Sequence, residues 1–471
     1  MVSEYQVIIV GLGLAGMSAA RTLQNRRLDV LLLDENNSPG GQYLRSVSRS
    51  IGTDSRPVRE NLKRVGHQLV RDLYHAGMTV KHGTQTVGLE ADGTVWTLGK
   101  EGRVEKHHAD HIILATGARE RFLPFPGWTL PGVISTGAAQ ILVKSAGILP
   151  GRNPIVGGAG PLPLALAGEI YASGGHVRAY WNQSSWSQQL HTLKGCRYHL
   201  SKVTLGMRCL TRLVASRTPL LHGYKVLEAR GNNVLEEVVL TAISHDGHVI
   251  QGSEKTFDVD CLAVGYGFVP NLELAMLAGC ELLHDKAKGG WVVKVEDNLQ
   301  SSVPPIFAAG ELTGIAGAEK SIIDGCLAGL SVAGKLGALN NATDKAEVKE
   351  LQKRRQREIA FGGLLNSLCE TPPGLIDGLP DQTMICRCED INLGQIRKEV
   401  SNGVTQLESM KKATNCGMGK CQGRTCGPII QEILTVLAQA IPENIRPYSV
   451  RNPIKPVPLS ALAESNDKEL S

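Results

Sequence analysis

The sequence predicts an α/β protein with two β-α-β folds and a separate cysteine-rich module near its C-terminus. Two glycine-rich turns, at residues 11–16 and 157–160, each follow a short apolar run and precede a helical pattern. Five of the 11 cysteines cluster between residues 386 and 426, where the composition changes. Because 471 residues are too many for one core of ordinary size, we expect several domains and more than one site.

The composition is typical of a soluble globular protein, with 42% hydrophobic and 20% charged residues. The net charge of +5 is mild, and no arginine-lysine stripe interleaved with aromatic residues supports a nucleic-acid partner. The sequence shows neither a signal peptide nor an apolar run that could span a membrane. We therefore expect a cytoplasmic protein, with a peripheral position at the inner face of the cell membrane as the alternative. Its cysteines should be thiols or metal ligands.

The first β-α-β fold opens the chain. The apolar run 7–10 ends in the turn Gly11-Leu12-Gly13-Leu14-Ala15-Gly16. A helical pattern follows, and a second apolar run, 30–33, ends at Asp34 and Glu35. In such a fold the glycines let the backbone approach a pyrophosphate, the helix N-terminus offers free N–H groups, and the acid binds a ribose. Since strand, helix and acid all agree with the glycines, we expect a dinucleotide site here.

The second fold departs from this pattern in two places. Its turn reads Gly157-Gly158-Ala159-Gly160-Pro161. Pro163 replaces the third glycine, and Trp181-Asn182 ends the second strand without an acid or an arginine. The turn residues Gly158, Gly160 and Pro161 could still contact phosphates, so NAD(P), ATP or ADP in this fold stays an open alternative.

Three further apolar runs end in a glycine turn. They lead into Ala115-Thr116-Gly117, Gly265-Tyr266-Gly267 and Ala308-Ala309-Gly310-Glu311. Each has the continuous apolar character of a strand buried on both faces of a parallel sheet. Residues 343–380 include a charged, helix-favouring stretch at 345–357, which we expect to be a solvated linker.

The order of motifs over residues 4–340 resembles the two-dinucleotide-binding-domain flavoproteins, whose Rossmann-type FAD domain is interrupted by a second nucleotide domain. The resemblance implies that FAD contacts Gly11, Gly13, Leu14, Ala15, Gly16, Asp34, Glu35, Gly41, Gln42, Thr116, Gly117, Gly310 and Glu311. It places Glu311 where members of the family hold the ribityl chain. The redox-active cysteine pair of the disulfide reductases is missing, because the first cysteine is Cys196, so a thioredoxin- or glutathione-reductase role is not expected.

The C-terminal cysteines have the spacing of metal ligands. Thiolates in such glycine-rich loops fit an iron-sulfur cluster or a structural zinc, and a flavin in the same chain favours iron. The pattern resembles the bacterioferritin-associated-ferredoxin-like (BFD-like) 2Fe-2S domain, a small helical module. That resemblance implies Cys386, Cys388, Cys421 and Cys426 as ligands. Cys416 is spaced from Cys421 as Cys426 is on the other side, and it stays a rival ligand.

Together the two parts resemble the FAD- and 2Fe-2S-containing subunit of heteromeric amino-acid dehydrogenases. That group includes the corresponding chains of opine oxidase, hydroxyproline dehydrogenase and hydrogen cyanide synthase. The resemblance implies an electron-transfer subunit, within an oxidoreductase acting on CH–NH or CH–NH2 donors, and no acid-base catalytic residue in this chain. The implied partner is a glycine/sarcosine-oxidase-like flavoprotein, with a small ferredoxin-like protein as a further candidate. The alternatives are a self-contained NAD(P)H-dependent flavin reductase and a non-enzymatic assembly protein.

These motifs predict the domain boundaries. We expect the FAD domain at 1–125 and 285–342, the inserted domain at 126–284, the linker at 343–380, the 2Fe-2S domain at 381–445 and an extended tail at 446–471. The segment 183–224 is long for a connection between strands and basic in its second half, so we expect it to contact a partner subunit.

Overall fold

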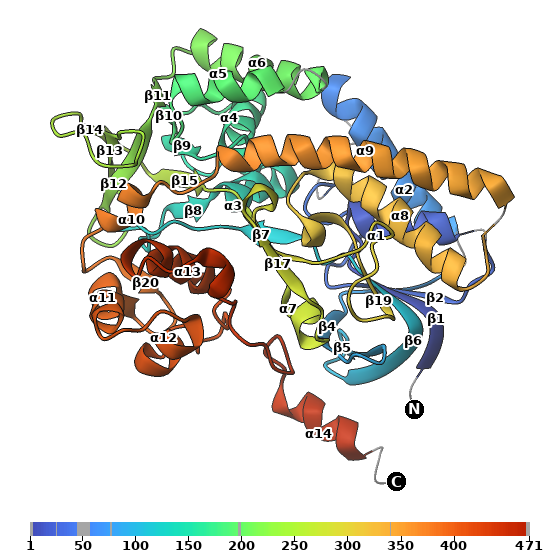
Figure 1. Ribbon diagram of the computed structural model, residues 1–471. Coiled ribbons are helices and arrows are strands. Elements are labelled where there is room, and N and C mark those ends of the chain that lie inside the picture. The colour runs from blue at the N-terminus through green and yellow to red at the C-terminus, as the bar shows by residue number, and fades with distance from the viewer. Residues whose placement is uncertain are drawn as a thin grey trace. The chain divides into compact units, whose positions relative to one another are not determined.

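A computed structural model describes residues 3–24, 26–44, 57–75, 78–195, 199–339 and 341–467. The chain forms two compact units (Figure 1). Unit 1 contains residues 1–119, 270–363 and 449–471, and unit 2 contains residues 120–269 and 364–448. The chain enters unit 2 through strand β7 (Ala118–Glu120) and returns through β16 (Phe268–Pro270). Cys196 lies outside the described residues.

Unit 1 is built on a seven-stranded sheet in the order β3-β2-β1-β6-β5-β4, with β19 also paired to β6. Its strands are β1 (Ser3–Val10), β2 (Val30–Asp34), β3 (Thr79–His82), β4 (Gln85–Leu89), β5 (Thr94–Leu98), β6 (Val104–Leu114) and β19 (Ile306–Ala308). β1, β2, β3, β6 and β19 run parallel, and β5 pairs antiparallel with the first half of β6. The glycine turn after β1 therefore lies at the carboxyl edge of a parallel sheet, where ligands of such sheets bind.

Helices of unit 1 contact strands of this sheet or pack against one another. They are α1 (Leu14–Leu23), α2 (Pro57–His75), α7 (Glu273–Leu277), α8 (Ala318–Lys335), α9 (Asn341–Ser367) and α14 (Leu459–Asp467). Shorter elements are β17 (Leu282–Asp285), η2 (Lys286–Lys288), β18 (Gly290–Val293) and η3 (Gly310–Thr313). α1 and α8 approach closely, because a Cβ at Gly325 would lie 2.1 Å from the Ala15 carbonyl oxygen. Residues 341–363 of α9 belong to unit 1, and its side chains at Leu351 and Arg355 are buried there.

Unit 2 contains a second parallel sheet of five strands, in the order β11-β10-β9-β15-β8. Its elements are β8 (Val133–Ser135), α3 (Thr136–Ile141), η1 (Leu142–Ala146), β9 (Pro154–Gly158), α4 (Leu162–Ala172), β10 (Ala179–Asn182), α5 (Trp186–Gly195), α6 (Leu200–Ala215), β11 (Leu220–His222) and β15 (Cys261–Gly265). A three-stranded antiparallel sheet follows β11, formed by β12 (Tyr224–Arg230), β13 (Glu237–Ala242) and β14 (Lys255–Asp258). The sheet order β10-β9-β15 reproduces the order β2-β1-β6 of unit 1.

The cysteine-rich module also belongs to unit 2. It consists of α10 (Pro373–Asp377), β20 (Met384–Cys386), β21 (Ile391–Asn392), α11 (Leu393–Ser401), α12 (Leu407–Thr414), α13 (Cys426–Leu437) and η4 (Pro442–Asn444). One hydrophobic core runs through both parts, from Trp181 and Leu262 of the second sheet to Ile430 and Leu434 of α13. The Trp128 indole N–H donates to the Met384 carbonyl at 2.8 Å, at the start of β20. The module is therefore packed on the second nucleotide-type fold.

Within the described residues, helices are too short or too polar to cross a membrane.

Candidate FAD and iron-sulfur sites

The three glycines of the first turn have three different surroundings. A Cβ at Gly11 would lie 2.5 Å from the Ala115 carbonyl oxygen, and one at Gly16 would lie 1.8 Å from the Gly11 carbonyl oxygen. These two glycines allow close packing of strand, turn and helix. At Gly13 the nearest described atom to such a Cβ is the Gly41 Cα, at 4.0 Å. Gly13 thus faces open space, which a pyrophosphate approaching the turn requires.

The start of α1 has the features of an anion site. Gly13 is its N-cap, and among the described residues no side chain accepts from the first N–H groups. Leu14, Ala15 and Gly16 supply the first turn, and each has a backbone N–H. Free N–H groups at a helix N-terminus bind phosphate well, because the helix dipole adds to the hydrogen bonds.

Asp34 holds the glycine turn in place. Its carboxylate accepts from the Leu12 N–H at 2.7 Å and from the Asn36 N–H at 2.7 Å, and it is 4% exposed. The next acid, Glu35, is exposed and pairs with Lys455. Glu35 is therefore the more accessible of the two predicted ribose-binding acids.

The remaining predicted FAD residues lie at ends of the same sheet or in turns beside it. The Gly40 N–H donates to the Leu12 carbonyl at 2.8 Å, which brings Gly41 against Gly13 and leaves Gln42 beside the turn. Thr116 donates its hydroxyl to the Asn271 carbonyl at 2.9 Å, and Gly117 follows at a φ of +68°. Both sequence-distant segments thus meet the first glycine turn within unit 1.

A buried charge network supports the turn at Gly310 and Glu311. Lys320 and Asp324 are both 0% exposed and pair at 2.9 Å. Arg355 of α9 binds Asp324 at 2.7 Å. The Lys320 ammonium donates to the Gly310 and Gly314 carbonyls, and Asp324 accepts from the Gly310 N–H at 3.1 Å. Buried ionic groups need such full pairing, so this network fixes the backbone on both sides of Glu311.

The pKa values in this network reflect burial and mutual attraction. Burial lowers the pKa of Lys320, and Asp324 opposes that shift. Burial alone would raise the pKa of Asp324, but Lys320 and Arg355 hold it below its usual value. Burial raises the pKa of Glu311. Asp324 is therefore ionised between two cations, which lets one carboxylate hold α8, α9 and the 310–314 turn together.

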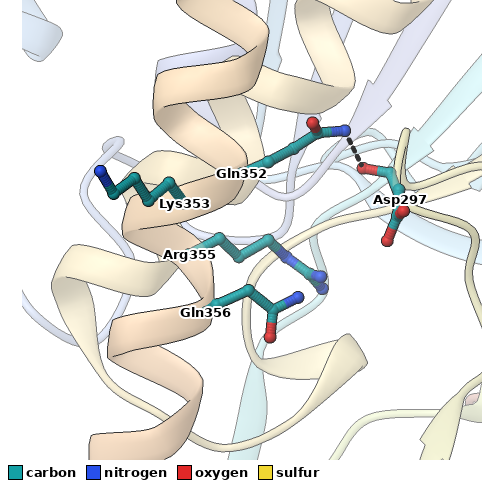
Figure 2. Close-up of a pocket in the computed structure, with 5 residues that line it drawn as sticks. All are labelled: Asp297, Gln352, Lys353, Arg355 and Gln356. Atoms are coloured by element: carbon teal, nitrogen blue, oxygen red, sulfur yellow. Dashed lines mark hydrogen bonds between the residues drawn. The ribbon is translucent and has the colours of Figure 1, made fainter.

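Together these residues fit FAD. The open face of Gly13, the uncapped start of α1 and the accessible carboxylate of Glu35 would hold pyrophosphate and ribose, and Glu311 would contact the ribityl chain. A pocket of about 230 Å³ beside α9 is a different feature (Figure 2). It is lined by Asp297, Gln352, Lys353, Arg355 and Gln356, and the Gln352 amide donates to the Asp297 carbonyl at 3.3 Å. None of these five belongs to the predicted FAD contacts.

Replacing Gly13 by alanine should weaken FAD binding without unfolding the protein. The Gly13 backbone, at φ −74°, accepts a side chain, and the added methyl group would occupy only space that the pyrophosphate needs. We expect about tenfold weaker FAD binding, roughly 1.4 kcal/mol, in a fluorescence titration of flavin-free protein. Gly206→Ala, in α6, is the control, since its Cβ would meet no described atom within 4 Å. Equal FAD affinity of both variants would contradict the predicted pyrophosphate position.

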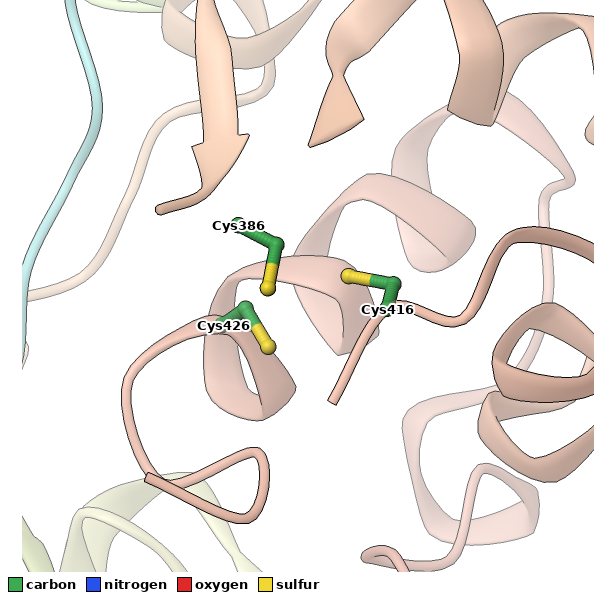
Figure 3. Close-up of side chains that lie close together, drawn as sticks. All are labelled: Cys386, Cys416 and Cys426. Carbon is green, nitrogen blue, oxygen red and sulfur yellow. The ribbon is translucent and has the colours of Figure 1, made fainter. Parts of the chain in front are cut away.

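The cysteine loops converge on one point. Cys386 at the end of β20, Cys416 after α12 and Cys426 at the start of α13 have sulfur atoms within 4.8 Å of one another (Figure 3). All three are buried. This group contains two of the predicted ligands, Cys386 and Cys426, and the rival Cys416.

The other two predicted ligands join the group through Cys421. Hydrogen bonds with Cys426 and, to a smaller extent, with Cys388 lower the pKa of the Cys421 thiol to about 4, although burial opposes the shift. Cys388 itself is exposed. The sulfur atoms of Cys386, Cys426, Cys421 and Cys388 thus follow one another from the core of the module to its surface. Four thiols in such contact fit a 2Fe-2S cluster, which is held by thiolates.

The ring of Tyr448 packs against the glycines of the cysteine loops. It is 7% exposed, and a Cβ at Gly417 or Gly423 would lie 2.8 or 2.3 Å from its ring. The Tyr448 hydroxyl is buried and has no hydrogen-bond partner among the described residues. Its burial, together with nearby thiols, raises the pKa of the phenol. Glycine is therefore required at two loop positions beside the cysteines, because a larger side chain would displace the ring.

The second glycine turn has different surroundings from the first. A Cβ at Gly158 would lie 1.9 Å from the Gly265 carbonyl oxygen, so this glycine packs as Gly11 does. A Cβ at Gly160 would lie 2.5 Å from the Cys369 sulfur, whereas its counterpart Gly13 faces open space. Pro161 is the N-cap of α4. Sequence reasoning could not detect Cys369, because it lies some two hundred residues further along the chain and belongs to no motif.

Comparisons with known proteins agree with this geometry. Residues 5–344 match the family described as pyridine nucleotide-disulphide oxidoreductase. The chain belongs to this family. Residues 384–435 match the BFD-like [2Fe-2S] binding domain. The two matches confirm the interrupted two-domain fold with its C-terminal module, and they confirm FAD and a 2Fe-2S cluster as the cofactors of this pyridine nucleotide-disulphide oxidoreductase. The individual ligand residues stay predictions.

Relatives of this oxidoreductase match along nearly the whole chain. Hydrogen cyanide synthase subunit HcnB of Pseudomonas aeruginosa is 31% identical over 96% of this chain and 97% of its own length. An opine oxidase subunit of Rhizobium meliloti is 29% identical over 98% of this chain and 87% of its own length. Among solved structures, L-proline dehydrogenase from P. horikoshii has a TM-score of 0.69 at 21% identity and covers 98% of this chain and 80% of that one. The last likeness supports the fold.

Proposed function

We propose that this chain is the FAD- and 2Fe-2S-containing electron-transfer subunit of a heteromeric amino-acid or amine dehydrogenase. The observation that carries the proposal is the presence of two redox sites in one chain: an open, uncapped glycine turn suited to FAD and five converging cysteines packed on the second fold. The relatives described as subunits of hydrogen cyanide synthase and opine oxidase support membership of a hetero-oligomer.

The residues of this chain would position the cofactors. FAD exchanges electrons in pairs and a 2Fe-2S cluster exchanges them singly, so together they can relay the electrons of an oxidised C–N bond. Gly13 and the start of α1 would hold the pyrophosphate, and Asp34 holds the turn that they form. Cys386, Cys388, Cys421 and Cys426 would ligate the cluster. The amine itself would be oxidised on a glycine/sarcosine-oxidase-like flavoprotein partner, with a small ferredoxin-like protein as a third component.

The isolated chain should not oxidise an amine. Its described residues form the FAD fold, the second fold and the cysteine module, and none of these parts supplies a further domain to enclose a substrate. The chain should be produced alone and together with a candidate amine-oxidising flavoprotein, and each product should be separated by size-exclusion chromatography. Dye reduction is then measured with proline, hydroxyproline, glycine and an opine.

We expect dye reduction only from a complex that contains both proteins. Equal rates from the isolated chain and the complex would place the substrate site within these 471 residues. Rapid reduction of the isolated chain by micromolar NADH would instead favour the alternative, a self-contained NAD(P)H-dependent flavin reductase.

A further inference from the structure

We infer that a segment of the chain itself, residues 368–370, occupies the nucleotide position of the second fold, so this fold holds the cysteine module and binds no pyridine nucleotide. The segment follows helix α9 and leads to α10 of the cysteine module. It lies in the same compact unit as the second fold. The inference is independent of the proposed function, because it concerns a site that the electron-transfer proposal does not use.

Cys369 occupies the position where a pyrophosphate would bind in the second fold. In a dinucleotide fold the second glycine of the turn has no side chain so that the pyrophosphate can approach its backbone. At Gly160 the Cys369 sulfur lies 2.5 Å from where a Cβ would be. At Gly267, on the turn after β15, the Cys369 Cβ lies 3.0 Å from the corresponding point. Cys369 therefore fills the space between the two glycine turns at the carboxyl edge of the sheet.

The start of α4 is also a poor phosphate site. Pro161 is its N-cap and Pro163 lies in its first turn. Since proline has no backbone N–H, the first turn lacks donors that α1 has at the matching positions. Burial raises the pKa of the Cys369 thiol, so the group in contact with the turn is a neutral thiol.

The segment 368–370 also occupies the position where the ribose of a nucleotide would bind. The Gln183 amide, which follows β10, donates to the Glu370 carbonyl at 2.8 Å. Ser184 donates its hydroxyl to the Leu368 carbonyl at 3.3 Å. Asn182, at the end of β10, accepts from the Ser184 N–H at 2.8 Å and is 6% exposed. The residues at the strand end, where a dinucleotide fold has its ribose-binding acid, thus bind the segment.

Arg121 connects the segment to both parts of unit 2. Its guanidinium donates to the Cys369 carbonyl, to the Tyr266 carbonyl at 3.1 Å and to the Glu432 carboxylate at 2.7 Å. Tyr266 directly follows strand β15 of the second sheet, and Glu432 lies on α13, the helix that begins at Cys426. One side chain therefore links the occupied nucleotide edge to the helix that carries a predicted cluster ligand.

The contact between Gly160 and Cys369 can be tested by a double-mutant cycle. Gly160→Ala adds a methyl group where the sulfur lies, and it also places alanine at a φ of +75°. Gly147→Ala is a matched control, because its φ is +67° and its Cβ would meet no described atom within 4 Å. Thermal unfolding of the full FAD-loaded chain is measured for each variant, with and without Cys369→Ala.

We expect Gly160→Ala to lower the unfolding midpoint by several degrees more than Gly147→Ala, and Cys369→Ala to remove that difference. Titration of the FAD-loaded wild-type chain with NADH, NADPH and ATP should show no saturable binding at micromolar concentrations. Equal effects of Gly160→Ala in both Cys369 backgrounds would overturn the inference. Saturable binding of NADH, NADPH or ATP to the FAD-loaded wild type at micromolar concentrations would also overturn it. The wild-type titration decides the question even where a variant fails to fold.

Discussion

Replacing Asp324 by alanine is expected to lower the free energy of unfolding by about 3–5 kcal/mol, which is typical for removing one partner of a buried ion pair. Asp324 is 0% exposed and lies between Lys320 and Arg355, at 2.9 and 2.7 Å. Without its carboxylate, two cations would remain in the interior without an anion between them. The Gly310 N–H and the Thr313 hydroxyl would also lose an acceptor.

Urea denaturation of FAD-loaded and FAD-free protein measures this effect. A loss of similar size in both forms is expected, because the network is complete within the chain. Asp381→Ala serves as the control, since Asp381 pairs with Arg397 at an exposed site, where ion pairs contribute little. A loss in the FAD-loaded form alone would mean that Asp324 stabilises the protein mainly through FAD binding.

The sequence could indicate only those parts of the candidate site that depend on local backbone geometry. Strand, turn and helix are consecutive in the chain, so the sequence indicated a glycine turn for a pyrophosphate, but it gave the glycines one shared role. The structure separates them, because Gly11 and Gly16 pack against backbone and Gly13 faces open space. The buried pair Lys320 and Asp324 could not be predicted in the same way, since a Lys and an Asp four residues apart usually lie on an exposed helix face. Their burial depends on α8 packing against α1 and on Arg355 reaching them from α9.

Contacts between segments that are distant in the chain could not be predicted from the sequence either. Pro163 and the strand end at Trp181-Asn182 showed that the second fold departs from the dinucleotide pattern. They left nucleotide binding open and did not indicate what fills the space. Cys369 and Arg121 contact the glycine turns of that fold, and neither residue belongs to a sequence motif. The stretch 345–357, expected to be a solvated linker, lies within helix α9, where Arg355 is buried. Only the tertiary fold brings each of these side chains to the residues that it contacts.

Replacing Cys421 or Cys388 by serine is expected to abolish or strongly alter the 2Fe-2S cluster, whereas Cys416→Ser should retain it. The wild-type chain should contain two irons and show the broad visible bands of the oxidised cluster. Cys421 contacts both Cys426 and Cys388, so the four predicted ligands form one continuous group of thiols. Loss of a thiolate ligand leaves an iron incompletely held.

Cys416 is the matched control because it is buried, its sulfur lies within 4.8 Å of those of Cys386 and Cys426, and it belongs to the same module. Cys416 is 0% exposed and belongs to the same hydrophobic core as Tyr448, which gives it a packing role beside the predicted ligands. Iron content, visible absorption and electron paramagnetic resonance of the reduced protein are measured for the three variants. Two irons in Cys388→Ser and none in Cys416→Ser would show that Cys416 takes the place of Cys388. In that case the buried group Cys386, Cys416 and Cys426 would itself supply three of the four ligands.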